Sequence, residues 1–365
     1  MGAADGAMKT LIAAYAGVLR GTGSSILSAL QDLSWLSKSK VEKQLQIISV
    51  LQWVVSFLMM GIICTIILIY MLCTDCWIIA VLYLVWYAFD WNTPSKAGRR
   101  SQWIRNWAIW RYFRDYFPIR MIKTHNLAPN RNYIFGYHPH GIMSLGAFCN
   151  FSTEATGVSQ IFPGIRPYVT TLTGNFRWPI LRDYLMTGGL CPVNRNTIDY
   201  LLSQNGTGNA VVIVVGGAAE SLNCAPGKNC VTLKHRKGFV KLALRHGADL
   251  VPIYSFGENE VFKQIIFEEG SWCRWVQKKL QKYIGVAPCI FHGRGVFSSN
   301  SWGLVPYARP VTTVVGEPIT IPKTDNPCQK EIDFYHNLYV QSLDRLFEKY
   351  KTKFGLSESE TLEIN

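Results

Sequence analysis

The sequence of 365 residues predicts an α/β domain that follows a membrane-embedded helical hairpin. Residues 44–74 hold no charged side chain over 31 consecutive positions, which is longer than the roughly 20 residues a helix needs to cross hydrocarbon. Beyond about residue 120, apolar β-branched runs alternate with helix-like stretches, a pattern typical of a sheet covered by helices on both faces. The chain therefore divides into an anchor and a large domain behind it.

Composition narrows the class of protein. The formal net charge of +13 suits a nucleic acid, an anionic lipid or a phosphorylated ligand as partner. The ten cysteines are scattered, and Cys73 with Cys76 is the one close pair. The spacing predicts neither a secreted disulfide framework nor a paired zinc site, and it favours a reduced, cytosol-facing domain.

The membrane segment is expected to span 44–91. After the first apolar run, residues 76–89 form a second apolar run of only 14 residues. This run either crosses the membrane with help from Trp91 or forms half of a re-entrant hairpin. Two buried core helices of a soluble protein are a weaker alternative, because the first run exceeds ordinary core-helix length. Both flanks are basic, which predicts cytosolic ends; the flanking residues are Lys38, Lys40, Lys43, Lys96, Arg99, Arg100 and Arg105.

Two segments beside the hairpin are expected at the membrane surface. In the N-terminal segment 1–43, residues 8–19 resemble a short signal peptide, but an uncleaved interfacial helix or a disordered tail is expected because the membrane element follows. Segment 92–125 interleaves tryptophans with arginines at helical spacing, which suits a helix at lipid headgroups. A segment of this composition could also bind single-stranded nucleic acid, but the direct attachment of the segment to the anchor disfavours that interpretation.

Residues 126–365 are expected to form the α/β domain. Its strand-like runs are 132–137, 209–217, 248–258 and 311–319, and 236–247 is helix-like. Near the end, Asn326 as cap and Pro327 at the first position predict a long helix. Apolar side chains recur along that helix at the spacing of a face that packs on the core; they are Ile332, Tyr335, Tyr339, Leu343, Leu346 and Tyr350.

Two histidines follow the first strand-like run, in "YHPHG". His138 and His140 flank Pro139, and Gly141 leaves space beside them, as expected of a placed general base. Zinc needs three or four ligands, and the nearby sequence offers no partner motif. Since the chain has no Gly-x-Ser-x-Gly motif, we expect a histidine to activate a substrate hydroxyl directly.

A second strand-like run ends in "GGAAES". Gly216 and Gly217 would let the backbone approach a ligand, and the carboxylate of Glu220 would orient a histidine or contact substrate. The run also hints at a nucleotide-binding loop, but it lacks the third glycine and the lysine of a phosphate loop.

These motifs together resemble the diacylglycerol O-acyltransferase type 2 family, a group that includes monoacylglycerol acyltransferases and wax synthases. The resemblance extends from about residue 8 to residue 365. It is carried by 116–118 (YFP), 138–141 (HPHG), 179–182 (PILR), 216–220 (GGAAE), 236–258 and 316–318 (GEP). More distantly, these blocks are similar to the glycerophosphate acyltransferases, whose histidine pairs with an aspartate five positions later; here Met143 and Leu145 occupy those positions, so Glu220 is expected to take that role.

The resemblance implies a glycerophosphate-acyltransferase-like mixed sheet and acyl transfer from acyl-CoA to the free hydroxyl of 1,2-diacylglycerol, with no metal or cofactor. It implies a location at the endoplasmic reticulum and lipid droplets, no nucleic-acid partner, and leaves a homo-oligomer open. Alternatives are a monoacylglycerol or long-chain alcohol acceptor, and a non-catalytic hairpin protein that coats lipid droplets. The site residues expected are catalytic His138, His140 and Glu220, and substrate-binding Gly141, Arg182, Gly216, Gly217 and Arg236.

Overall fold

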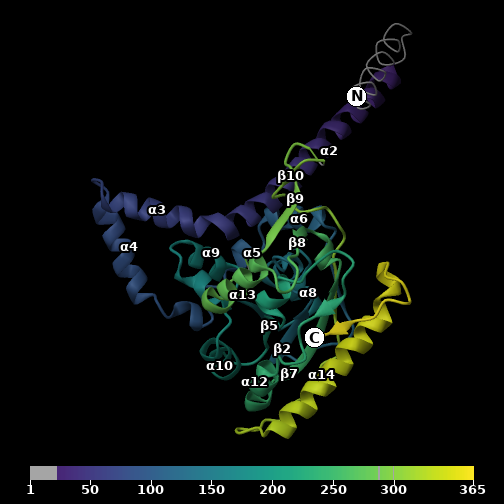
Figure 1. Cartoon of the computed structure of the whole chain (residues 1–365). Coiled ribbons are helices and arrows are strands. Elements are labelled where there is room, and N and C mark those ends of the chain that lie inside the picture. Colours follow the sequence, from purple (N-terminus) through teal and green to yellow (C-terminus); the bar gives the residue numbers. More distant parts are fainter. Residues whose placement is uncertain (1–22, 287, 299) are drawn as a thin grey trace.

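A seven-stranded mixed sheet forms the centre of the domain (Figure 1). The structure, a computed structural model, describes residues 23–286, 288–298 and 300–365, so the interfacial helix expected at 8–19 lies outside the described residues. The strand order is β1-β11-β7-β2-β5-β3-β4; the last five strands run parallel, and β11 pairs antiparallel with β7. The strands are β1 (Arg120–Lys123), β2 (Tyr133–His138), β3 (Arg166–Thr171), β4 (Leu190–Pro192), β5 (Asn209–Val214), β7 (Asp249–Phe256) and β11 (Thr312–Val315).

The central strands explain the unbroken apolar runs in the sequence. Every residue of β2 and of β7 is buried, because β2 lies between β5 and β7 and helices cover both faces. The four strand-like runs correspond to β2, β5, β7 and β11, which confirms the predicted mixed α/β class. The expected domain boundary at residue 126 comes too late, however, since β1 already belongs to the sheet.

Helices α10 (Arg195–Ser203), α12 (Gly238–His246) and α14 (Gln329–Tyr350) cover one face of the sheet. Helices α2 (Gly23–Val55) and α6 (Ala108–Tyr116) and the segment 145–162 cover the other. Smaller sheets, β10-β9-β8 and β12-β6, lie beside the main one. The remaining elements are α5 (Gln102–Arg105), α6 (Ala108–Tyr116), α7 (Leu145–Ala147), η3 (Phe148–Ser152), α8 (Val158–Ile161), α9 (Leu181–Thr187), α10 (Arg195–Ser203), α11 (Gly217–Ser221), β6 (Cys230–Val231), α12 (Gly238–His246), β8 (Lys263–Ile265), α13 (Trp272–Ile284), β9 (Ile290–Arg294), β10 (Trp302–Gly303), α14 (Gln329–Tyr350) and β12 (Glu363–Ile364), with short 3-10 turns η2 (Thr93–Ser95), η4 (Thr173–Arg177), η5 (Glu258–Glu260) and η6 (Thr352–Phe354).

The long C-terminal helix α14 begins later than expected. Its cap is Cys328 rather than Asn326, and the Glu331 carboxylate accepts the Cys328 N–H at 2.7 Å, so the carboxylate fixes the start of the helix at Gln329. The predicted apolar face is otherwise correct, with Tyr335 and Tyr350 only partly buried; its fully buried members include Ile332, Tyr339, Leu343 and Leu346.

The apolar N-terminal region divides into two parts. Residues 39–72 form one helix that is long and apolar enough to cross a membrane, continuing from α2 (Gly23–Val55) through a π-helical turn η1 (Ser56–Met60) into α3 (Gly61–Leu72). Trp53 and its neighbours Val50 and Val54 are buried against the domain, whereas α3 leads away and α4 (Trp77–Phe89) returns (Figure 1). At 13 residues, α4 measures about 20 Å, which is shorter than a hydrocarbon core of roughly 30 Å. Of the two arrangements expected for the second apolar run, this length favours half of a re-entrant hairpin.

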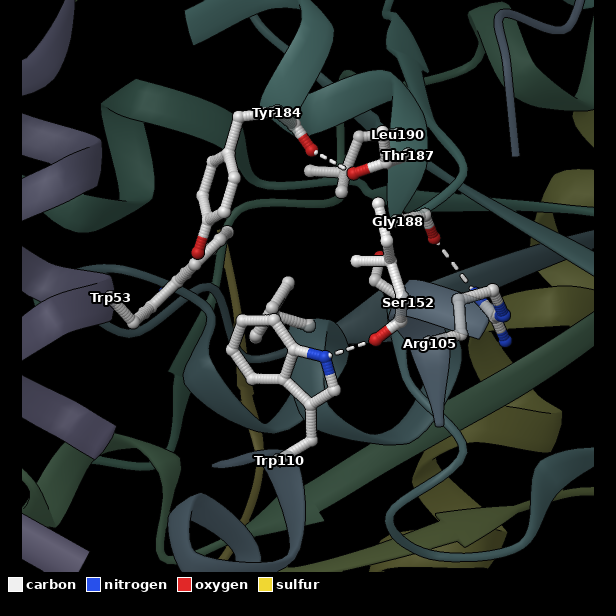
Figure 2. Close-up of a pocket in the computed structure, with 10 residues that line it drawn as sticks. Trp53, Arg105, Trp110, Ser152, Tyr184, Thr187, Gly188 and Leu190 are labelled. Carbon is white, nitrogen blue, oxygen red and sulfur yellow. Dashed lines mark hydrogen bonds between the residues drawn. The ribbon is translucent and has the colours of Figure 1, made fainter. Parts of the chain in front are cut away.

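The basic-aromatic segment 92–125 lies partly inside the core. Trp103 is 73% exposed, but Trp110 is 4% exposed and packs edge-on against Phe148. Arg105 is fully buried, and its guanidinium donates to the Glu154 carboxylate at 3.0 Å and to the Gly188 carbonyl at 2.8 Å (Figure 2). Only the outer side of this segment is therefore available to a membrane surface.

Candidate active site

The two strands that carry the predicted motifs are neighbours. β2 and β5 pair in parallel, so the loop after His138 and the loop after Val214 both leave the sheet at the carboxyl-terminal ends of the strands. Ligands bind at this end of the strands in open parallel sheets, because the loops can diverge there. The geometry brings His140 and Glu220 together from positions 80 residues apart in the chain.

His138 lies on the α14 side of the sheet, inside the core. Its ring is fully buried, and Nε2 lies 3.0 Å from the Tyr339 hydroxyl, which itself donates to the Gly136 carbonyl at 3.0 Å. Nε2 therefore carries the proton, and Nδ1 has no hydrogen-bond partner among the described residues. Burial lowers the pKa of His138 to about 3, so the ring stays neutral.

His140 faces the opposite side, where a cavity opens. Its Nδ1 lies 2.8 Å from the Ser221 hydroxyl and 3.1 Å from the Gly141 carbonyl. A carbonyl can only accept, so these contacts favour the tautomer with the proton on Nδ1 and a free lone pair on Nε2. Within the described chain, no hydrogen bond reaches Nε2. Burial lowers the pKa of His140, which keeps the ring neutral and able to accept a proton.

Glu220 contacts the main chain of the histidine loop and does not reach an imidazole. Its carboxylate accepts the His140 N–H at 2.5 Å and the Thr232 N–H at 2.6 Å. Only 4% of the residue is exposed, and burial raises the pKa of Glu220 to about 7, although both amide bonds oppose this shift. The sequence predicted a carboxylate that orients the ring; in the structure Ser221 holds the ring and Glu220 holds its backbone.

An apolar cavity of about 220 Å³ connects His140 to the membrane helix. Its walls come from the histidine loop, from the ends of β3 and β5, and from the anchor. Trp53 stacks on Phe148 of the domain with 3.5 Å between ring centroids, so the anchor forms a fixed wall. The anchor contributes Trp53, Phe57 and Leu58, and the loops contribute His140, Ile142, Ser144, Gly217, Ala218 and Ser221. A smaller space of about 10 Å³, which Trp53, Trp110 and Tyr184 surround, lies beside it (Figure 2).

At each of the three predicted positions, a different local cause favours glycine. Gly141 has φ +61°, and an added Cβ would approach the Glu258 side chain to 2.9 Å. Gly216 lies against Glu220, whose carboxylate an added Cβ would overlap. Gly217 has φ +56° and lines the cavity with open space around its Cα. A side chain is therefore excluded at the first two positions and strained at the third.

The two predicted arginines lie apart. Arg182 is fully buried and bonds to the Asp90 carboxylate at 3.0 Å and carbonyl at 2.6 Å, with its guanidinium 4.6 Å over the Tyr87 ring. It connects α9 to the base of the hairpin and does not reach the cavity. Arg236 is exposed and lies 3.5 Å from the Gly216 carbonyl, so it is near the site and open to solvent.

Sequence reasoning missed two site residues. Ser221 follows Glu220 directly, but a lone serine outside a nucleophile motif carries no signal. Glu258, the last residue of the 236–258 block, is 1% exposed, and its carboxylate accepts the Gly146 N–H at 3.0 Å and the Tyr137 hydroxyl at 2.8 Å. Burial raises the pKa of Glu258 to about 7. A glutamate two residues after a buried strand was the available signal for this second carboxylate under the histidine loop.

Comparison with known proteins identifies the family. Residues 69–365 match the family described as "Diacylglycerol acyltransferase". The chain belongs to this family. It is 75% identical over 361 residues to diacylglycerol O-acyltransferase 2 of Bos taurus and 70% identical to that of Homo sapiens, covering 98% of this chain and all of each relative. It is 52% identical to 2-acylglycerol O-acyltransferase 3 of Homo sapiens, over 89% of this chain and 96% of that protein.

This membership makes the chain an acyltransferase, which excludes the alternative of a non-catalytic coat protein. With the apolar helix at 39–72, it also indicates a membrane protein. Among solved structures, a 1-acyl-sn-glycerophosphate acyltransferase from Thermotoga maritima aligns with 65% of this chain and 75% of that chain at 10% identity. Its TM-score of 0.35 is too low to carry an argument. In the described part of the chain, no three His, Cys, Asp or Glu side chains are placed to hold a metal ion.

Proposed function

We propose that the protein transfers an acyl group from acyl-CoA to the free hydroxyl of 1,2-diacylglycerol, with His140 as general base and without an acyl-enzyme. The observation that carries the proposal is the cavity, which joins a neutral imidazole to the surface of a membrane helix. Both the acyl chain and diacylglycerol are apolar, and diacylglycerol resides in a leaflet. A cavity with Trp53, Phe57 and Leu58 in its wall suits such substrates.

The chemistry follows from the state of the His140 ring. Nε2 takes the hydroxyl proton as the oxygen attacks the thioester carbonyl, and the imidazolium then gives the proton to the departing CoA thiolate as the C–S bond breaks. Amide N–H groups of the first turn of α11, at Gly217 and Ala218 in the cavity wall, are suited to the developing oxyanion. Gly141 and Gly216 keep the two loops close enough to the reacting atoms.

Ser221 supports a competing route, because a serine hydroxyl 2.8 Å from a histidine could be a nucleophile. The tautomer disfavours that route: Nδ1 faces the Gly141 carbonyl as well, so it carries the proton and cannot accept one from Ser221. Ser221→Ala should therefore lower kcat by about tenfold or less. An acyl-enzyme that hydroxylamine releases from wild-type protein and not from Ser221→Ala would establish the serine route instead.

The charged head of CoA needs cations outside the apolar cavity. Arg236 is exposed beside Gly216, and Lys234 and His235 are exposed next to it in the same loop. These side chains form a basic edge at the mouth of the site, which suits phosphate groups. Arg182 does not bind CoA in this proposal, since its guanidinium is buried against Asp90 and connects α9 to the base of the hairpin.

The experiment uses purified full-length protein in detergent or lipid with labelled acyl-CoA and diacylglycerol. Triacylglycerol is the expected product, and His140→Ala should reduce its formation by about a hundred- to ten-thousandfold while membrane association is kept. His138→Ala is the paired variant: it should lose stability rather than the chemical step. Full activity in His140→Ala would refute the assignment of the base.

A monoacylglycerol acceptor is the second candidate, because the chain is 52% identical to a protein named 2-acylglycerol O-acyltransferase 3. Competition between diacylglycerol, 2-monoacylglycerol and a long-chain alcohol in the same assay ranks the acceptors. We also propose that the protein resides in the endoplasmic reticulum and on lipid droplets with both termini cytosolic. Protease protection of tagged termini in intact microsomes tests that orientation.

A further inference from the structure

We propose that residues 363–365, at the C-terminal end of the chain, position His140 through the loop 229–234 and the Glu220 carboxylate, an inference that rests on the base role proposed above. These residues lie far from the cavity in sequence and touch none of its walls. They are connected to the histidine loop by three successive links, in which main-chain amides donate first to main-chain oxygens and then to the Glu220 carboxylate.

The first set joins the C-terminal residues to the loop. β12 pairs in parallel with β6, and the Asn365 N–H donates to the Val231 carbonyl at 2.9 Å. The Leu233 and Lys234 amides then donate to the main-chain oxygen of Asn365 at 2.7 and 2.9 Å. The Glu363 N–H donates to the Asn229 carbonyl at 2.8 Å. Four hydrogen bonds thus hold the loop in an extended shape.

The second link is the amide of Thr232, which lies between Val231 and Leu233, two of the three residues whose main chain bonds to Asn365. In an extended chain, successive N–H groups point in opposite directions. Val231 and Leu233 use their groups toward Asn365, so the Thr232 N–H points away from the C-terminal strand and donates to Glu220 at 2.6 Å. Without the C-terminal pairing, the orientation of the Thr232 N–H would no longer be fixed.

The third link is the Glu220 carboxylate itself. Its second oxygen accepts the His140 N–H at 2.5 Å, and within the described residues these two amides are its only hydrogen-bond donors. Because Glu220 is only 4% exposed, water cannot easily replace a lost amide. Withdrawing the Thr232 amide therefore frees the carboxylate to rotate and loosens the backbone of the base.

The C-terminal segment is also anchored before it reaches β6. Leu362 is 8% exposed and packs in the core, the Lys351 ammonium donates to the Glu360 carbonyl at 2.7 Å, and the Asn229 side chain donates to the Glu360 carboxylate at 2.6 Å. Removing residues 363–365 leaves these anchors in place. The deletion therefore tests the last pairing and not the attachment of the whole segment.

Hydrogen exchange of the full-length protein tests the coupling without using activity. The variants are a chain that ends at Leu362 and Glu363→Pro, which removes the Glu363 N–H; Glu363→Ala keeps that bond and is the control. We expect faster exchange in segment 230–234 and also in 138–144 for the first two variants only, with an unchanged melting temperature for the control. Faster exchange confined to 230–234 would overturn the proposal.

Kinetics provides the second readout. The deletion should lower kcat by about two- to tenfold with KM for diacylglycerol unchanged, the effect of one poorly made hydrogen bond. In a Glu220→Ala background the deletion should have no further effect, because both changes remove the same link. An equal loss in both backgrounds would show that these residues act elsewhere. If His140→Ala stays fully active, the proposed base fails, but the exchange result still decides the coupling.

Discussion

Glu220→Gln tests whether a carboxylate that holds only main-chain amides matters to the reaction. The wild-type side chain accepts N–H groups of His140 and Thr232 with its two oxygens. Glutamine has one oxygen, so its NH2 group would face one of these donors and leave it unbonded. Losing a hydrogen bond to a charged acceptor costs about 1.5–3 kcal/mol. If the loss falls on the transition state, kcat drops by about ten- to a hundredfold.

The same variant should change the pH profile. Burial raises the pKa of Glu220 to about 7 and lowers that of His140 below its ordinary value of 6.5. Only the ionised carboxylate can accept from both amides, so wild-type kcat should rise with pH through about 7 while His140 is already neutral. In Glu220→Gln the rise near pH 7 should disappear. A rise at lower pH, from His140, should remain.

The assay is the initial rate of triacylglycerol formation between about pH 5 and pH 9 at saturating acyl-CoA, a range that brackets both groups. Glu358→Gln is the matched control, because Glu358 is exposed and makes no described hydrogen bond. If Glu220→Gln keeps wild-type kcat and the same rise near pH 7, the carboxylate does not act on the base, and the coupling argued from it is wrong.

Three further predictions concern stability and the role of buried groups. Because burial raises the pKa of Glu258 to about 7, well above its unfolded value, wild-type stability should fall as pH rises from about 5 through about 7, and Glu258→Gln should flatten that dependence of the melting temperature. Arg182→Ala should lower the free energy of unfolding by about 1.5–3 kcal/mol, since it removes the hydrogen bonds of Arg182 to Asp90 while Asp90 keeps its ion pair with Arg99, and KM for acyl-CoA should not change. Tyr339→Phe should cost about 1–3 kcal/mol in chemical denaturation but keep kcat within about twofold, because His138 is structural.

The sequence predicts the strands and the histidine pair well, because both are local patterns. The sequence also holds the information that places the His138 side chain in the core. Side chains alternate along β2, so Tyr137 faces the Glu258 side while His138 faces α14. What the alternation cannot give is the position of His140, since the turn through Pro139 ends the strand and reverses the side.

Other parts of the site depend on contacts that no local pattern encodes. Arg182 belongs to a motif that the resemblance links to substrate, yet its partner Asp90 lies 92 residues earlier, at the base of the hairpin. Ser221 becomes a partner of His140 only when β2 and β5 are neighbours. Such pairings follow from the strand order, which the periodicity of a single chain leaves undetermined.

The packing of the anchor brings the apolar helix to the wall of the proposed active site. A hairpin that served only to attach the domain could be joined by a linker, but Trp53 stacks on Phe148 and the Gln52 amide donates to the Tyr184 hydroxyl at 2.7 Å. These contacts fix the end of α2 beside the histidine loop, and they make Phe57 and Leu58 part of the cavity wall. In the proposed mechanism, a lipid held against Phe57 and Leu58 would lie in the same cavity as His140, which is the physical advantage of building the cavity partly from the anchor.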